Sequence, residues 1–243
     1  MTGRAKRSAG PVLLLSSLFF ALAFAGLGLW QIQRLYAKLD LIARIEARLD
    51  AAPVDAPEPD AFTPDDAYRR VALDGHFLND REILVQAVTE RGGGFWVLTP
   101  FVTESGFIVL VNRGFVPPEN REPASRAAGQ ITGPTRLVGL LRLTEPEGAF
   151  LRHNDPAAGR WFSRDVGAMA QASGLASVVS VAPYFVDADD APVPGGLPVG
   201  GLTVVRFANN HLIYALTWFA LALMCAGAAV WLWRGEAGRD GAP

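Results

Sequence analysis

The chain has 243 residues, half of them hydrophobic, with 22 basic and 24 acidic side chains and a formal net charge of −2. This balance gives no basic field, so nucleic acid is excluded as an expected partner. The single cysteine, Cys225, excludes an intrachain disulfide framework and any paired-cysteine metal motif, which also disfavours copper-carrier chemistry.

An apolar run from residue 12 to residue 30 follows three basic residues, Arg4, Lys6 and Arg7. The basic start and the small-residue exit at residues 23–25 also fit a cleavable secretory signal. The run nevertheless continues to Trp30, and about nineteen apolar residues are enough to cross a bilayer. We predict an uncleaved signal anchor: a transmembrane helix at 12–30 after a cytoplasmic N-terminus at 1–11.

The helical pattern continues past the first membrane span. Apolar residues recur there at three- and four-residue steps, with basic residues on the other faces: Ile32, Leu35, Leu39, Ile42, Ile45 and Leu49. This pattern predicts an amphipathic helical extension at 31–50, which packs on its own domain or lies at the lipid headgroups. Residues 51–66 are rich in proline and acidic side chains and predict an extended linker.

Strand patterns dominate residues 67–208, which we predict to form an external β-rich domain. The expected strands are separated by short Gly, Asn and Asp clusters, including the triple glycine at 92–94, and cover residues 69–77, 82–88, 95–102, 107–113, 135–143, 178–186 and 202–207. One helix is expected from Ser163, as its cap, to Ala172. The short gaps favour antiparallel hairpins in a curled sheet or small barrel. Loops 118–133 and 188–201 are too long for simple turns and predict disorder or function.

The second apolar segment, residues 209–233, carries no charge from Leu212 to Trp233 and spans roughly 33 Å as a helix. The expected fold class is therefore membrane α+β: two transmembrane helices flanking an external, mainly antiparallel β domain with one or two helices. The basic residues near both ends place both termini, including residues 234–243, on the cytoplasmic side. The central domain then faces the opposite side, which in a bacterium is the periplasm.

His211 lies in the first turn of the second span, and Tyr214 and Trp218 follow it at i+3 and i+7, so we expect the three to share one face. A histidine just inside a membrane helix is a functional candidate by default. The alternative is an interfacial histidine bonded to water or Asn210, beside ordinary aromatic residues of the membrane boundary. At the same membrane face the first span ends in further candidates, for which anchoring is the simpler interpretation: Trp30, Gln31 and Arg34.

Seven short stretches match one known pattern, in order and over nearly the whole chain. They are residues 28–31 with Arg34 and Lys38, 75–77, 111–117, 139–142, 160–165, 183–185 and 210–219. On these stretches the chain resembles the Surfeit locus protein family, membrane factors for the assembly of cytochrome c oxidase. The NRGFVP and NHLxYAxTWF stretches together are specific.

The resemblance implies a non-catalytic role in the maturation of oxidase subunit I. Bacterial members have been linked to haem a binding and delivery, and the proposed haem ligand of the family matches His211, with Tyr214 and Trp218 as pocket candidates. The implied partners are subunit I and the proteins of haem a biosynthesis or assembly. Arg113 then either pairs with a haem propionate or an oxidase carboxylate, or forms an intradomain salt bridge.

Two other functions remain open from the residues. One is a cofactor-free scaffold that acts only through protein contacts, and the other is a two-span sensor of a small ligand. The sequence shows no nucleophile elbow, catalytic triad context or metal-binding helix motif, so we do not expect an enzyme or a metal site other than haem iron at His211.

Overall fold

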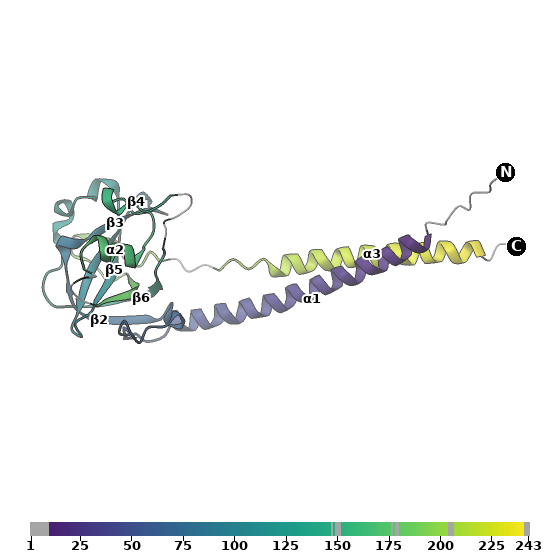
Figure 1. The fold of residues 1–243 in the computed structure, drawn as a ribbon, viewed down its shortest axis with the longest axis horizontal. Coiled ribbons are helices and arrows are strands. Elements are labelled where there is room, and N and C mark those ends of the chain that lie inside the picture. The colour runs from purple at the N-terminus through teal and green to yellow at the C-terminus, as the bar shows by residue number, and fades with distance from the viewer. Residues whose placement is uncertain are drawn as a thin grey trace. The chain divides into compact units, whose positions relative to one another are not determined.

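The computed structural model describes residues 10–146, 148, 152–175, 177, 180–203 and 207–240. The chain forms two compact units, one of residues 1–44 and 206–243 and the other of residues 45–205. The first unit is helical, and the second holds the strands that the structure describes (Figure 1).

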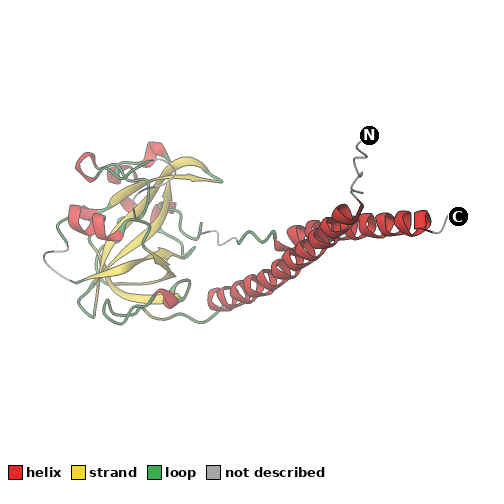
Figure 2. Cartoon of the chain, turned by 45° about the vertical axis from the view of Figure 1, so that its right-hand side comes forward, coloured by secondary structure: helices red, strands yellow, loops and turns green. Residues whose placement is uncertain are grey.

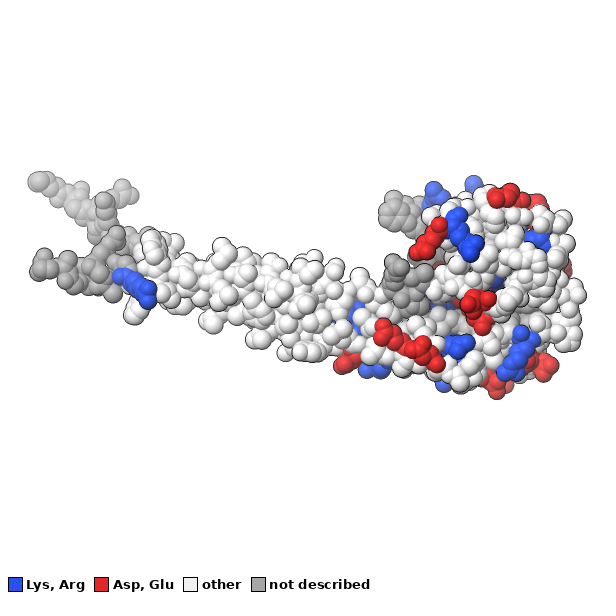
Figure 3. Space-filling model, turned by 180° about the vertical axis from the view of Figure 1, so that it is seen from behind, with Lys and Arg blue, Asp and Glu red and all other residues white. Residues whose placement is uncertain are grey.

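Two long helices form the helical unit: α1, Gly10–Leu49, whose last residues belong to the second unit, and α3, His211–Asp240 (Figure 2). Their most apolar windows have mean hydropathies of 2.3 and 1.9, and only 6% and 11% of those windows are buried. Figure 3 shows charged side chains gathered on the β domain, while the middle of the helical unit is almost free of them. Exposed apolar helices of this length are suited to lipid, and the fold class is membrane α+β. The predicted extension at 31–50 continues the first helix without a break.

Seven strands form one sheet in the order β1-β2-β6-β7-β5-β4-β3. Their bounds are Val54–Asp55 (β1), Arg70–Phe77 (β2), Ile83–Thr89 (β3), Gly92–Thr103 (β4), Ile108–Val116 (β5), Thr135–Leu143 (β6) and Val181–Ala188 (β7). An additional antiparallel pairing of β2 with β4 closes the sheet into a small barrel. The pairs β1–β2 and β5–β7 are parallel, and the others are antiparallel. The predicted small, mainly antiparallel barrel is confirmed.

Strand β5 explains how the barrel is packed, because every one of its residues is buried. Val109 and Val111 join the cluster that includes Phe101 and Tyr184. Leu110, between them in sequence, joins a second cluster, with Trp161, Phe185 and residues of the short helix α2, Val166–Ala172. Successive side chains of a strand point to opposite faces, so β5 separates two apolar layers.

Residues 51–66 differ from the prediction of an extended linker. Val54 and Asp55 pair with β2 as strand β1, and Phe62 packs on the ring of Tyr184 at 5.0 Å between centroids. The buried Tyr184 hydroxyl donates a hydrogen bond to the Pro57 carbonyl, and burial, the larger cause, together with the charge of Asp66 raises the pKa of Tyr184. A proline-rich composition shows only that the segment is extended, whereas Tyr184, far away in sequence, holds it on the barrel.

Replacing Tyr184 by phenylalanine is expected to cost about 1–2 kcal/mol, because the Pro57 carbonyl loses its donor while the ring stays in place. Amide hydrogen exchange of residues 54–62 should accelerate in this variant. Tyr68→Phe, which alters another tyrosine of the same domain, serves as the control. Unchanged exchange in Tyr184→Phe would contradict the packing of this segment.

Several element boundaries differ from those expected. Helix α2 begins at Val166 with Asp165 as its cap, because the Asp165 carboxylate accepts from the Ala168 amide at 3.1 Å. The Ser163 hydroxyl accepts instead from the Gly148 amide at 2.9 Å. The triple glycine begins strand β4 and is not a separate turn. Glycine is needed at position 94, because a side chain there would overlap the Val116 carbonyl on the neighbouring strand β5. Residues 202, 203 and 207 are not strand, and 204–206, like 178 and 179, lie outside the described residues.

The two long loops are folded against the barrel. Loop 118–133 contains two short 3-10 helices and loop 188–201 contains one. The 3-10 helices of the described part of the domain lie at Pro64–Asp66, Asn79–Arg81, Pro118–Asn120, Pro123–Gly129, Pro156–Ala158 and Pro194–Gly196. The buried guanidinium of Arg126 forms an ion pair with the Glu82 carboxylate, which holds loop 118–133. Loop 188–201 is held by Val199, whose amide and carbonyl both bond to Phe115 at 2.9 Å. Leu49, at the end of α1, and Thr203 line one cavity of about 220 Å³, so the chain enters and leaves the barrel at one place.

Candidate functional site

His211 is the first residue of α3, and its ring meets Gln31 of α1. The imidazole Nδ1 lies 2.7 Å from the Gln31 side-chain oxygen Oε1. With the amide oxygen as acceptor, Nδ1 is the donor in this contact, and in a neutral imidazole the lone pair then lies on Nε2. Metal-ligating histidines have this arrangement, in which the second nitrogen is fixed by a hydrogen bond. The backbone carbonyl of Asn210 accepts from the Tyr214 amide at 3.2 Å, in the first turn of α3.

The helix pair continues in register two turns deeper. Trp218 stacks on Phe24 with 5.6 Å between ring centroids and an interplanar angle of 24°. From His211 to Trp218 the chain advances seven residues along α3, and the partner moves back seven residues along α1. Between them Ala215 is fully buried, and a side chain at Gly28 would meet the Phe219 ring at 2.6 Å. Small residues therefore let the two helices approach closely, as in other membrane helix pairs.

Tyr214 does not share this face, contrary to expectation. Its side chain is 55% exposed, whereas His211 and Trp218 both contact α1. At 3.6 residues per turn, a seven-residue step nearly completes two turns, but a three-residue step falls about 60° short of one. The structure thus brings together His211, Trp218 and Gln31, and leaves Tyr214 outside.

Two cations follow Gln31 along α1 in the direction away from the bilayer centre. The Arg34 guanidinium lies 5.8 Å from the centroid of the Trp30 ring, and the Lys38 ammonium lies 5.3 Å from the Phe207 ring. Positions 31 and 38 are seven residues apart and lie nearly in line along α1, while position 34 is turned about 60° from position 31. Among the residues that the structure describes, neither cation lies in an ion pair. This end of the helix pair thus combines an imidazole, aromatic rings and two positive charges that have no carboxylate partner among the described residues.

Arg113 belongs to the β domain, whereas the other candidates belong to the helical unit. Its guanidinium donates to the Gly129 carbonyl and to the Asn79 side chain at 3.2 Å, and it lies 4.5 Å from the centroid of the Phe77 ring. Burial, the main cause, lowers the pKa of Arg113 to about 10. These hydrogen bonds to neutral groups differ from the intradomain salt bridge that we considered, and the bond to Gly129 holds loop 118–133.

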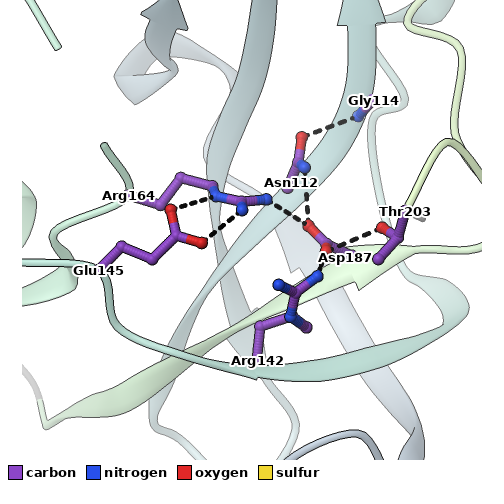
Figure 4. A network of polar contacts seen from close by, with 7 residues as sticks. All are labelled: Asn112, Gly114, Arg142, Glu145, Arg164, Asp187 and Thr203. Atoms are coloured by element: carbon purple, nitrogen blue, oxygen red, sulfur yellow. Dashed lines mark hydrogen bonds and ion pairs between the residues drawn. The ribbon is translucent and has the colours of Figure 1, made fainter. Parts of the chain in front are cut away.

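A buried polar network around Asp187 contains one residue from each of three stretches that carry the family resemblance: Asn112, Arg142 and Arg164. The buried carboxylate of Asp187 accepts from Asn112 at 2.7 Å, Arg142 at 2.9 Å and Arg164 at 3.3 Å (Figure 4). Thr203 adds a fourth hydrogen bond at 2.8 Å. Burial lowers the pKa of Arg164, but Glu145 and Asp187 outweigh it, so its pKa is raised. This network fixes β5, β6 and β7 to one another and is structural.

Sequence reasoning missed Phe24, Gly28 and Phe207 as neighbours of the site. Their types are common in membrane helices and give no signal on their own. An antiparallel alignment of the two spans anchored on Gln31 and His211 finds Phe24 opposite Trp218, because equal steps along two helices keep residues paired. These neighbours can therefore be found by aligning the two helices residue by residue, but only once one contact between the helices is known.

These features define the class as a two-span membrane protein with a small β-barrel domain between its spans and a histidine where the spans meet. The SURF1 family model matches residues 18–223. The chain is 36% identical to Surfeit locus protein 1 of Xenopus tropicalis over 94% of this chain and 77% of that protein. It is 39% identical to Surfeit locus protein 1 of Homo sapiens, over 86% and 72%. A SURF1-like protein of Monosiga brevicollis is 38% identical, over 89% and 85%.

The chain belongs to the SURF1 family. Members of this family are assembly factors for cytochrome c oxidase, and this protein is a membrane-anchored assembly factor for that oxidase, which is its partner.

Proposed function

We propose that this assembly factor binds haem a where α1 and α3 meet and assists its insertion into oxidase subunit I. The observation that supports the proposal is the hydrogen bond between Gln31 and His211, because a neutral imidazole that donates through Nδ1 would offer its Nε2 lone pair to the haem iron. When bound, haem supplies an iron that accepts the imidazole lone pair. The residues present fit this group in charge and polarity.

The neighbouring side chains support the same proposal. Arg34 and Lys38 offer positive charge to the haem propionates, and guanidinium suits the bidentate recognition of carboxylates. Trp218 and Phe24 offer an aromatic surface to the macrocycle. In this proposal Gln31 is a positioning residue, since it orients the His211 ring and fixes its tautomer.

The proposal extends to location and partners. The helices cross the bacterial cell membrane with both termini in the cytoplasm and the β domain in the periplasm, as the basic residues at the two ends favour. Subunit I and the proteins that supply haem a are the proposed partners. The role is one of binding and transfer, without catalysis.

The haem proposal is tested by co-expressing the full chain with the haem a pathway and recording the absorbance spectrum of the purified protein. We expect His211→Ala to lose the haem spectrum and Gln31→Leu to lower haem affinity about 10–100-fold, as for other lost partners of a metal-bound histidine. Gln31→Glu keeps an acceptor for Nδ1 and should retain haem. His76→Ala, at an exposed histidine of the β domain, is the matched control.

A full haem load in His211→Ala would remove His211 as the ligand. Oxidase activity measured in the same strains separates the two kinds of assembly factor. If His211→Ala supports full oxidase activity, the protein acts as a cofactor-free scaffold, and the haem proposal is wrong.

A further inference from the structure

Among the residues that the structure describes, strand β3 has no strand neighbour on one edge over part of its length. It pairs with β4 on one side and ends the strand order of the sheet (Figure 1). On its other side the Gln86 amide donates to the Trp161 carbonyl at 2.9 Å, so this amide points away from β4. Val88 lies two residues further, and alternation along a strand directs its amide and carbonyl the same way. The Val88 side chain is 91% exposed.

A cavity of about 550 Å³ adjoins this open edge. Its described lining is largely apolar and comprises Gln86, Ala87, Val88, Gly93, Gly94, Phe95, Pro118, Arg152 and Phe162. None of these described residues carries a carboxylate. An open strand edge beside an apolar cavity is the arrangement by which domains bind an extended peptide as an added strand.

Two arginines stand beside the cavity, each over an aromatic ring that lines it. The Arg152 guanidinium lies 5.4 Å from the Phe162 centroid and donates to the Gln86 side chain at 3.0 Å. The Arg121 guanidinium lies 5.3 Å from the Phe95 centroid. Contact with a ring or an amide positions a guanidinium without neutralising it. Neither arginine forms an ion pair with any residue that the structure describes.

We propose that the β3 edge binds an extended acidic segment of a partner protein as an additional strand. The main chain of the segment pairs with Val88, one apolar side chain enters the cavity, and carboxylates pair with Arg121 and Arg152. A second copy of this chain suits the site less well, because self-pairing of β3 brings like-charged arginines together. The acidic stretch of the chain itself, residues 51–66, is packed elsewhere on the barrel. The proposal does not depend on haem binding.

The test uses the full chain in detergent micelles and a fluorescent peptide of alternating glutamate and valine. We expect this peptide to bind at least about ten times more tightly than one of alternating lysine and valine, measured by anisotropy. Bound peptide should also slow hydrogen exchange of the Val88 amide. Arg121→Glu and Arg152→Glu should each weaken binding about ten-fold, while Arg136→Glu, at an exposed arginine on β6, should leave it unchanged.

Val88→Pro separates main-chain pairing from side-chain contact. It removes the outward amide without removing a bond between β3 and β4, so peptide affinity should fall about ten-fold. Val88→Ala keeps the amide and should retain most of the affinity. Circular dichroism confirms that each variant is folded.

Three outcomes would overturn the proposal. The first is equal binding of the acidic and basic peptides. The second is displacement of the acidic peptide by phosphatidylglycerol vesicles, which would assign the surface to lipid. The third is self-association in sedimentation velocity that Val88→Pro abolishes, which would assign the edge to a second copy.

Discussion

Replacing Asp187 by alanine is expected to lower the free energy of unfolding of the β domain by about 3–5 kcal/mol, because two guanidinium groups lose their buried counter-charge. Arg142 and Arg164 both pair with this carboxylate, and Asn112 and Thr203 bond to it as well. Arg164 keeps Glu145 as a partner at 2.5 Å. Arg142 has no second carboxylate partner among the described residues, so its charge is the one left uncompensated.

Chemical denaturation of the full chain in micelles, followed by tryptophan fluorescence, measures this loss. Asp74→Ala is the matched control, since Asp74 pairs with Arg136 at 2.8 Å on the surface and exposed pairs contribute about 0–1 kcal/mol. Asp187→Asn should fall between the two, because it keeps hydrogen-bond acceptors but not the charge. Equal effects of Asp187→Ala and Asp74→Ala would show that the buried network contributes no more than a surface pair.

Gly114→Ala is expected to cost about 2–4 kcal/mol, from backbone strain and steric overlap together. Gly114 has a φ of +128°, which residues with a side chain rarely adopt. A Cβ there would also overlap the Val199 carbonyl, in the loop that is hydrogen-bonded to Phe115. The substitution should therefore detach loop 188–201 from the end of β5.

The control for Gly114 is Gly106→Ala. Gly106 also has a positive φ, +87°, but a Cβ there meets nothing within 4 Å, so this variant carries backbone strain alone, about 1 kcal/mol. Thermal unfolding and limited proteolysis of loop 188–201 check the pair. If both variants unfold at the same temperature and resist protease equally, the overlap with Val199 is relieved without cost.

Local patterns in the sequence were enough to predict the helices and most strands. The period of two in residues 135–143 gave β6 with its observed bounds, and apolar length gave both spans. Patterns failed where a distant residue decides the structure. Residues 51–66 look like a linker because nothing nearby shows that Tyr184 holds them. Asp165 rather than Ser163 caps α2, because Ser163 accepts from Gly148 instead.

The candidate site was predictable in its residues but not in its contacts. The sequence nominated both His211 and Gln31, yet their hydrogen bond depends on how far one helix slides along the other. That register depends on Ala215 and Gly28, whose small size says nothing about depth in the membrane. Tyr214 was misplaced by rotation about the helix axis, which no motif records. For Arg113 the sequence left two roles open, and the hydrogen bonds to Gly129 and Asn79 that place it inside the domain come from residues far from it in the chain.

The shared entry and exit point of the barrel has a consequence for how the membrane helices find each other. Gln31 and His211 are 180 residues apart in the chain, a long loop to close in a disordered polymer. Once the barrel folds, Leu49 and Thr203 line the same cavity, so the residues between them no longer add to the length of flexible chain that must be closed. The effective loop is then about three doublings shorter, which reduces the entropic cost of closure by about 2 kcal/mol. Folding of the barrel therefore favours the pairing of α1 and α3, and the haem proposal requires that pairing.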